Sequence, residues 1–417
     1  MYQTEASFHH TKPLNPWHML FWLLFAQVLI AFVGRSLAPL GVFIGEGLSL
    51  TNAQIGLLPA ALFLGQFLIA IPSGVIVDRT GTRPLLLIVS LCLGLSFALA
   101  ALVNQFWLLL LLIAIGGCGY GAMHPTSNRG IIYWFSHRKR GTAMGIKQMG
   151  VTAGSAFAAL LLVPLADIVG WRPVFIGIGL LLSAAGLLSY IKYRDTAEAQ
   201  ESRTPETNKR LTIQQLKEMV KNRPLLITSI GAMGLNGSQM CLNTYLIIYS
   251  TQSIGLPVAL AAVLLVLSEA SGSAGRIAWG VISDRYFYGN RLIIMTIIAL
   301  MSAGSAAILA LFPEGTSFLA VAAVALAFGF SVSGFNGLWM NAATELVPQK
   351  QAGLATGFSI SLGSWGVIIG PPLFGLITDI TGTFAAAWYS MAAMLVIIGI
   401  IFYSLHRERL RGDAVNA

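Results

Sequence analysis

Charged residues are scarce in this chain. Only 10% of its 417 residues are Asp, Glu, Lys or Arg, whereas 56% are hydrophobic. Because an ordinary soluble domain carries about 25% charged residues, this composition could not cover a surface that faces water. A surface that faces lipid has no such requirement, since hydrocarbon chains solvate it. The scarcity of charge therefore predicts an integral membrane protein.

The chain also lacks the usual signatures of cofactor chemistry. Its three cysteines, Cys92, Cys118 and Cys241, lie inside apolar stretches and show no metal-ligand spacing. No Gly-Lys-Ser/Thr phosphate-binding motif occurs, and the loops are too short to hold a soluble catalytic or signalling domain. We therefore expect no enzyme activity, no metal and no cofactor, and we exclude an ATP-driven pump built from this chain alone.

Long apolar runs are abundant instead. Twelve of them are long enough to cross a bilayer, which takes about 20 residues per helix. They lie at residues 18–44, 52–77, 84–103, 106–134, 141–168, 172–192, 225–250, 258–281, 291–312, 316–343, 353–377 and 383–405. The first run is too long for the core of a signal peptide, so we expect it to be retained.

Basic residues are distributed unevenly between the loops. If both termini lie inside the cell, 20 of the 25 Lys and Arg residues fall in inward-facing loops or tails, and only Arg172 falls in an outward loop. Such an asymmetry is what the positive-inside rule describes. We predict a protein of the cell (inner or plasma) membrane with both termini in the cytoplasm. The net charge of +9 reflects this topology, and we expect no nucleic-acid partner.

The two sets of six runs share an internal repeat. Gly74, Asp78 and Arg79 recur 206 residues later, and a second group recurs at an offset of 212 residues. The second group is Gly141, Gly145, Gly154, Asp167 and Gly170, which recur as Gly353, Gly357, Gly366, Asp379 and Gly382. Matches at one fixed offset indicate duplication, and transporters built in this way bind their substrate between the halves near the midplane.

These patterns predict an all-α membrane protein with twelve transmembrane helices in two pseudo-symmetric six-helix bundles. Residues 1–192 form the N-terminal bundle, and residues 224–417 form the C-terminal bundle with a cytoplasmic tail. The polar segment 193–223 forms a cytoplasmic linker, with one amphipathic helix near Leu211–Val220.

The loop after the second run has a distinctive sequence, Gly74-Val-Ile-Val-Asp78-Arg79-Thr-Gly81-Thr-Arg83, and a degenerate copy of it follows the eighth run. With these motifs the chain resembles the major facilitator superfamily over essentially its whole length. The resemblance implies a gate, in which Asp78 sits at the positive end of a neighbouring helix and Arg79 and Arg83 pair across the cytoplasmic seam. Asp284 and Arg285 are the copies in the second half. The alternative is that these residues only fix a tight loop.

A second set of residues carries a closer resemblance. It consists of His124-Pro125-Thr-Ser-Asn128-Arg129, then Trp134-Phe135, then Arg140-Gly141-x-Ala143-x-Gly145. This pattern is similar to the anion:cation symporter group and related organic-acid (monocarboxylate-like) importers. The resemblance implies that one arginine in the first helix and one in the fourth hold the acid group of the substrate, which here are Arg35 and Arg129. That group usually has an Asp immediately before the first arginine, and this chain has Gly34.

The charged residues inside the predicted spans indicate an organic anion as substrate independently of the family resemblance. Away from the ends of the spans lie four cations, Arg35, Arg129, Lys147 and Arg276, and one acid, Glu269. A charge at the bilayer centre costs roughly 2.5–3.5 kcal/mol on insertion scales, so none should face lipid. A cavity with a surplus of three positive charges attracts anions, and the planar fork of arginine suits a carboxylate.

Each of these residues also has an alternative role. Arg129 could extend to the inner surface or bind a helix end, and Lys147 could be a structural partner at the cytoplasmic gate. Arg276 precedes Asp284 by eight residues, in a pattern that resembles many superfamily members with no shared substrate. Glu269 is the candidate for proton coupling, because a carboxylate in an apolar wall binds a proton more readily than one in water. The competing hypothesis is a permanent pair of Glu269 with Arg276 or Lys147.

Uncharged polar residues complete the candidate site. Tyr120, Asn336 and Asn341 are candidate substrate contacts, with Asn243 and Tyr245 as further hydrogen-bonding groups. The alternative for each of them is a hydrogen bond between helices.

The leading prediction is a secondary importer of a small carboxylate that moves with protons by alternating access, as a monomer in the lipid bilayer. The runner-up is an exporter of drugs or amphiphiles in exchange for protons. An exporter of that kind would be expected to have more central acids and fewer cations. The anion, the stoichiometry and the direction of transport stay open at this point.

Overall fold

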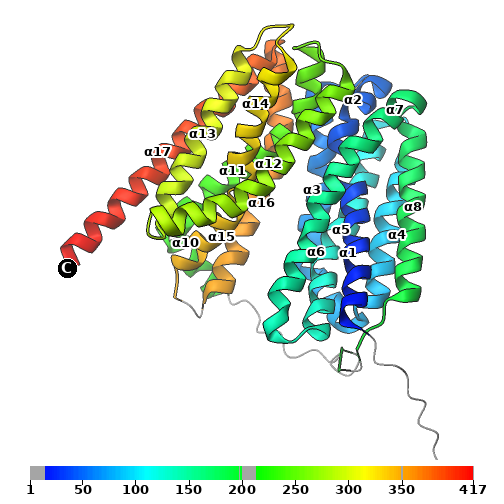
Figure 1. The fold of residues 1–417 in the computed structure, drawn as a ribbon, viewed down its shortest axis with the longest axis horizontal. Helices are drawn as coiled ribbons and strands as arrows, with labels where there is room; N and C mark the ends of the chain where they lie inside the picture. The colour runs from blue at the N-terminus through cyan, green and yellow to red at the C-terminus, as the bar shows by residue number, and fades with distance from the viewer. Residues whose placement is uncertain (1–14, 197, 200–212, 349–350, 417) are drawn as a thin grey trace, which may run out of the picture.

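The structure is a computed structural model that describes residues 15–196, 198–199, 213–348 and 351–416 (Figure 1). Its described residues are almost entirely helical, and twelve helical segments are long and apolar enough to cross a membrane. The predicted fold class, an all-α protein with twelve transmembrane spans, is therefore confirmed.

The first six spans are built from eight α-helices and one π-helical turn. These are α1 (Pro16–Gly34), α2 (Leu37–Leu48), α3 (Asn52–Thr80), α4 (Thr82–Ala100), α5 (Phe106–Trp134), α6 (His137–Phe157) with the π-helical turn η1 (Ala158–Leu162) and α7 (Val163–Val169), and α8 (Trp171–Lys192). A short amphipathic helix, α10 (Ile213–Lys221), precedes the second set, close to where the sequence predicted it.

The last six spans follow in the same order. They are α11 (Arg223–Gln252), α12 (Val258–Tyr286), α13 (Arg291–Leu311), α14 (Phe318–Phe328) with the π-helical turn η2 (Gly329–Ser333) and α15 (Asn336–Glu345), α16 (Ala352–Thr381) and α17 (Phe384–Asn416). α16 remains one continuous helix although Pro371 and Pro372 lie inside it.

The first span is broken in its middle. α1 ends at Gly34, α2 begins at Leu37, and Arg35 and Ser36 lie in the turn between them. Pro39 has no N–H group, so it cannot donate the helical hydrogen bond to the carbonyl of Arg35 four residues earlier. The next residue, Leu40, does donate to the carbonyl of Ser36. The proline therefore accounts for a break at the position of the arginine.

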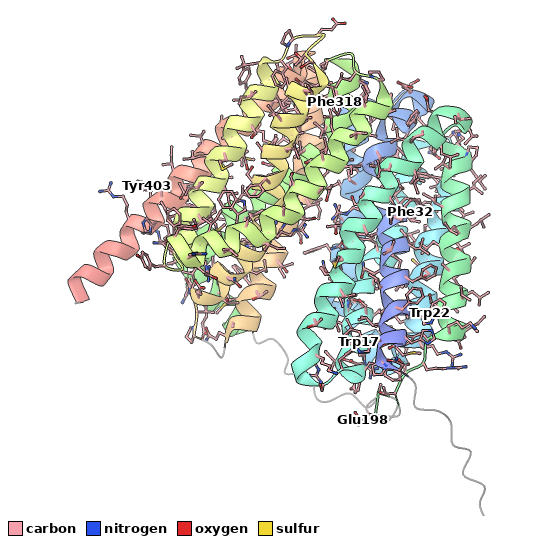
Figure 2. All side chains as sticks on the ribbon, in the orientation of Figure 1. Trp17, Trp22, Phe32, Glu198, Phe318 and Tyr403 are labelled. Atoms are coloured by element: carbon pink, nitrogen blue, oxygen red, sulfur yellow. The ribbon has the colours of Figure 1, made fainter. Side chains whose placement is uncertain are left out.

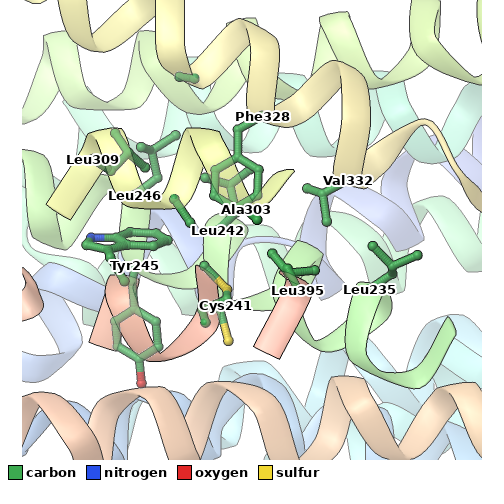
Figure 3. Close-up of a cluster of buried hydrophobic side chains, with 14 of the residues drawn as sticks. Leu235, Cys241, Leu242, Tyr245, Leu246, Ala303, Leu309, Phe328, Val332 and Leu395 are labelled. Atoms are coloured by element: carbon green, nitrogen blue, oxygen red, sulfur yellow. The ribbon is translucent and has the colours of Figure 1, made fainter. Parts of the chain in front are cut away.

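Two large hydrophobic clusters form the cores. One joins helices α1 to α8, and the other joins α11 to α17 and also includes Val42, Ile55, Ala159 and Val163 from the first set. Figure 3 shows part of the second cluster, where Leu242 and Leu246 of α11 lie near Phe328 of α14 and Leu395 of α17. Cys241 is buried in this cluster. It is one more apolar side chain of the core, as its sequence context predicted.

The two groups of helices meet at one end of the molecule and diverge toward the other in the view of Figure 1. Figure 2 shows Trp17 and Glu198 at the diverging end and Phe318 at the opposite end. We call the diverging end the linker end, because α8 ends and α11 begins there. We call the end where the two groups meet the far end. Hydrogen bonds between described residues of the two groups occur only at the far end, where Asp379 and Tyr245 bond to the start of α3.

Candidate functional site

Arg35 lies in the break between α1 and α2 and points toward α3 and α5. Its Nε donates a hydrogen bond to the hydroxyl of Tyr120 over 3.2 Å. Its guanidinium carbon lies 5.6 Å from the centre of the Phe63 ring, within the range of a cation–π contact. No hydrogen bond from its two terminal nitrogens to a described residue is present. The side chain is thus held by its inner nitrogen, and the fork remains available.

Arg35 lines a small cavity between the two groups of helices. The first group also contributes Phe63 and Ser155, and the second contributes Asn243 and Glu269. Facing groups of opposite charge therefore come from opposite halves of the chain. The structure thus brings two of the candidate residues, Arg35 and Glu269, to one cavity, with Tyr120 hydrogen-bonded to Arg35.

Glu269 is held by a neutral partner. Asn243 of α11 donates from Nδ2 to Oε1 of Glu269 over 2.7 Å, and Glu269 is only 8% exposed. Among the described residues, no salt bridge within 4.0 Å joins Glu269 to a cation. The permanent pair with Arg276 or Lys147 that the sequence left open is therefore absent from this conformation.

Arg276 and Lys147 are also bound to neutral groups. Arg276 Nε donates to the carbonyl of Ser333 in η2 over 3.2 Å. Lys147 is 2% exposed, and its Nζ donates to Oδ1 of Asn128 over 2.9 Å. Neither forms a salt bridge with a described residue. A neutral acceptor leaves the positive charge of each side chain without a counter-ion.

Arg129 is in a different place. Its Nε donates to Oδ1 of Asp78 over 3.1 Å, and its Nη2 donates to the carbonyl of Ala199 over 3.2 Å. Its guanidinium carbon lies 4.8 Å from the centre of the Tyr133 ring. The structure therefore pairs Arg129 with Asp78 at the linker end and does not bring it to the cavity of Arg35. Of the four cations predicted inside the spans, three, Arg35, Lys147 and Arg276, are therefore without a salt bridge to a described residue.

The candidate gate residues bond within their own halves. Arg83 Nε donates to the carbonyl of Tyr190 over 2.7 Å, and its guanidinium stacks on the ring of that tyrosine. Asp284 accepts a hydrogen bond from Arg291, which also donates to Glu345 over 3.2 Å. Arg79 and Arg285 are exposed. No described contact of these residues crosses between the halves at the linker end.

The three uncharged candidates, Tyr120, Asn336 and Asn341, lie in different places. Tyr120 is 4% exposed and touches Arg35 directly. Asn336 donates to Oε1 of Gln239 in α11 over 3.3 Å, so it joins two helices. Asn341 is exposed. Only Tyr120 of these three is a neighbour of the small cavity.

The structure also explains the glycine before Arg35. A Cβ atom placed on Gly34 would lie 2.4 Å from Cδ2 of Tyr120, which is closer than real atoms approach. The ring of Tyr120 occupies the space that an aspartate side chain at position 34 would need. The departure from the family pattern thus follows from the tyrosine that orients Arg35.

Sequence reasoning missed Phe63 and Ser155 as neighbours of Arg35. Both lie on apolar or small-residue faces, and no charge or motif marks them. Phe63 also lines a larger cavity of about 430 Å³, together with Gln66, Asn236 and Trp339. This volume falls within the range of small-molecule sites. Because α3 continues from Phe63 toward the linker end, the larger cavity lies on that side of Arg35.

A family model described as Major Facilitator Superfamily matches residues 23–361 and 287–416. The chain belongs to this superfamily. It is similar to the hexuronate transporter of Bacillus subtilis, with 26% identity over 90% of this chain and 92% of that one. It is also similar to a probable sulfoacetate transporter of Cupriavidus necator, with 25% identity over 91% of each chain, and to the D-galactonate transporter of Escherichia coli, with 25% identity over 94% and 96%.

Solved structures share the fold of this superfamily member. The nucleoside transporter NupG (D323A mutant) has a TM-score of 0.78 at 18% identity, over 93% of this chain and 99% of that one. A bacterial homologue of the lysosomal transporter Spinster, in an inward-facing and unoccupied conformation, has a TM-score of 0.75 at 18% identity, over 95% and 98%. The protein is therefore a multi-pass membrane transporter of the superfamily and not an enzyme.

Proposed function

We propose that this transporter carries a small organic anion, a carboxylate, across the cell membrane by alternating access, in symport with protons. The observation that carries the proposal is the charge at the centre of the molecule. Arg35 faces the acid Glu269 across the small cavity, and Arg35, Lys147 and Arg276 are each bound to a neutral group. Unpaired charges in a low-dielectric cavity are costly, so an anionic substrate stabilises the site when it arrives.

The orientation of Arg35 supports a carboxylate in particular. Tyr120 holds Nε, which leaves the two terminal nitrogens for the two oxygens of one carboxylate. Such bidentate pairing is stronger and more directional than a contact with a point charge. Phe63 covers one face of the guanidinium and keeps the fork from turning away.

The relatives support the same substrate class. The three transporters named above are described as carrying hexuronate, sulfoacetate and D-galactonate. All three substrates are anions with an acid group and an organic body. At 25–26% identity this similarity supports a carboxylate or a related organic anion for our chain and leaves the individual substrate to experiment.

Glu269 is the proposed proton carrier. It lines the same cavity as Arg35, so the two opposite charges attract each other across it. When a carboxylate binds Arg35, the favourable interaction of Arg35 with Glu269 is weakened and a second negative charge is added nearby. Both changes favour protonation of Glu269, which couples one proton to one anion.

The proposed orientation places the linker end in the cytoplasm, following the distribution of basic residues. This conformation is then open toward the cytoplasm, since the hydrogen bonds between the halves that involve described residues all lie at the far end. Asp78, Arg79, Arg83, Asp284 and Arg285 would form the cytoplasmic gate in the opposite conformation. We propose that the functional unit is a monomer, because one chain contains both halves of the site.

Thermal stability of the purified protein against a panel of organic acids tests substrate binding. A true ligand should raise the melting temperature of the wild type and not that of Arg35→Gln. Arg223→Gln is the matched control, since Arg223 is 72% exposed in a surface ion pair, and it should respond like the wild type. An acid that stabilises Arg35→Gln as well as the wild type would remove Arg35 from the site.

Uptake into proteoliposomes tests the coupling. Uptake by the wild type should increase as the pH on the substrate side falls, and Glu269→Gln should lose this dependence because its side chain cannot take up a proton. Unchanged pH dependence in Glu269→Gln would exclude Glu269 as the proton carrier. Resistance to lipophilic cations in cells that carry the gene, without uptake of any acid, would favour the exporter.

A further inference from the structure

The far end of the molecule contains a contact that the sequence analysis did not assign to any role. Asp379, near the end of α16, reaches the first turn of α3 in the other half. Its Oδ1 accepts hydrogen bonds from the backbone N–H and from Nδ2 of Asn52, both over 2.9 Å. Its Oδ2 accepts from the backbone N–H of Ala53 over 2.8 Å.

These bonds complete the cap of α3. The first N–H groups of a helix have no acceptor within the helix. Here the side chain of Thr51 accepts from the N–H of Gln54, and the N–H groups of Asn52 and Ala53 are left for Asp379. A carboxylate at this position also interacts favourably with the positive end of the helix dipole. One half of the transporter therefore caps a helix of the other.

Tyr245 strengthens the contact from α11. Its hydroxyl lies 2.8 Å from the carbonyl oxygen of Asn52 in one half and 2.8 Å from that of Pro371 in the other. Glycines make room for it, because a Cβ atom on Gly56 or on Gly375 would lie 2.4 Å from this hydroxyl oxygen. The seam is thus built from helices that approach closely at two glycines.

The internal repeat provides a counterpart that does not form this contact. Asp167 precedes Asp379 by the repeat offset of 212 residues, yet it is exposed and forms no described hydrogen bond. The helix corresponding to α3 is α12, where the offset of 206 residues places Val258 opposite Asn52. Val258 has no side-chain amide, and the N-cap Pro257 forms no side-chain cap. Only one of the two aspartates is therefore engaged.

We propose that Asp379 is a positioning residue for transport, which holds the far end closed and so sets the balance between the two access states. This inference rests on the proposed alternating access, since the three hydrogen bonds must break whenever the far end opens. Asp379 does not line the cavity of Arg35 and acts on the substrate only through the position of α3 and α16. Loss of its charge favours the conformation that is open at the far end.

Accessibility of the central cavity from the far end tests this role. Ser155, 8% exposed, lines the small cavity with Arg35. In a background with Cys92, Cys118 and Cys241 replaced by alanine, the variant Ser155→Cys is reacted with a membrane-impermeant maleimide on either side of oriented vesicles. Asp379→Asn should accelerate labelling from the far-end side roughly threefold to thirtyfold, the range expected for charge-assisted hydrogen bonds at a helix terminus. Labelling from the linker-end side should not increase.

Two further variants make the result decisive. Asp167→Asn removes the corresponding charge of the other half and should leave the rate of far-end labelling within twofold of the parent. Asp379→Glu keeps the carboxylate, so its rate of far-end labelling should be closer to that of the parent than the rate of Asp379→Asn. Equal effects of Asp379→Asn and Asp167→Asn, or faster labelling from both sides as in a loosened fold, would overturn the proposal. The labelling assay requires no substrate. A negative result for Asp379 is therefore distinguishable from a failure to identify a transported organic anion.

Discussion

Replacement of Gly34 by alanine gives the sharpest test of how the site is organised. The added Cβ would lie 2.4 Å from Cδ2 and 2.6 Å from Cε2 of Tyr120. The ring cannot turn into solvent, because Tyr120 is 4% exposed and its ring lies edge-on to Phe63 with 6.1 Å between centres. It must therefore shift, and the hydroxyl that holds Nε of Arg35 shifts with it.

The size of the effect follows from the cost of overpacking. Extra carbon atoms in a packed interior cost about 1–3 kcal/mol. If the shift of Tyr120 and Arg35 raises the free energy of the anion-bound state by this amount, the affinity of Gly34→Ala for the anion falls roughly fivefold to 150-fold, at about 1.4 kcal/mol per factor of ten. Equilibrium binding of an anion identified in the acid panel, measured by titration calorimetry, gives the dissociation constant directly.

Two controls separate this explanation from a general loss of stability. Gly304→Ala in α13 adds a methyl group where nothing lies within 4 Å, and it should bind like the wild type. The double variant Gly34→Ala/Tyr120→Leu removes the clashing ring and should not bind more weakly than Tyr120→Leu alone. Wild-type affinity in Gly34→Ala, or a further loss in the double variant, would refute the proposed support of Arg35 by Tyr120.

Further outcomes follow from the other contacts. Arg129→Gln should lower the free energy of unfolding by about 1–3 kcal/mol, because the buried guanidinium and its hydrogen bonds to Asp78 and to the carbonyl of Ala199 are lost, while the dissociation constant of the anion stays within about twofold, as thermal denaturation and binding on the same sample will show. Lys147→Met removes a positive charge from the centre and should weaken anion binding about tenfold or more, and a calorimetric titration that gives wild-type affinity would exclude Lys147 from the site. Gly375→Ala should force α16 away from Asn52 and accelerate far-end labelling of Ser155→Cys, and unchanged labelling would show that close approach there is not required.

The candidate site could be predicted only in part from the sequence. Arg35 was identified because a charge in the middle of an apolar run has few acceptable surroundings in a bilayer. Arg129 met the same criterion, but it lies near the end of a span, where an acid in the last turns of a neighbouring helix can reach it. Asp78 is such an acid. Depth along one helix does not reveal which side chains of another helix lie opposite.

The sequence alone determined the features that the bilayer imposes on a single segment. The number and order of the spans and the presence of cations inside them follow from length, hydropathy and charge along the chain, because the bilayer makes a charged side chain costly wherever it stands in a span. The tertiary structure decided which groups meet. Asp167 and Asp379 occupy equivalent positions in the repeat, yet only Asp379 reaches a helix that offers it free N–H groups and an amide. That difference arises from the packing of one half against the other, which depends on distances between residues about 330 positions apart.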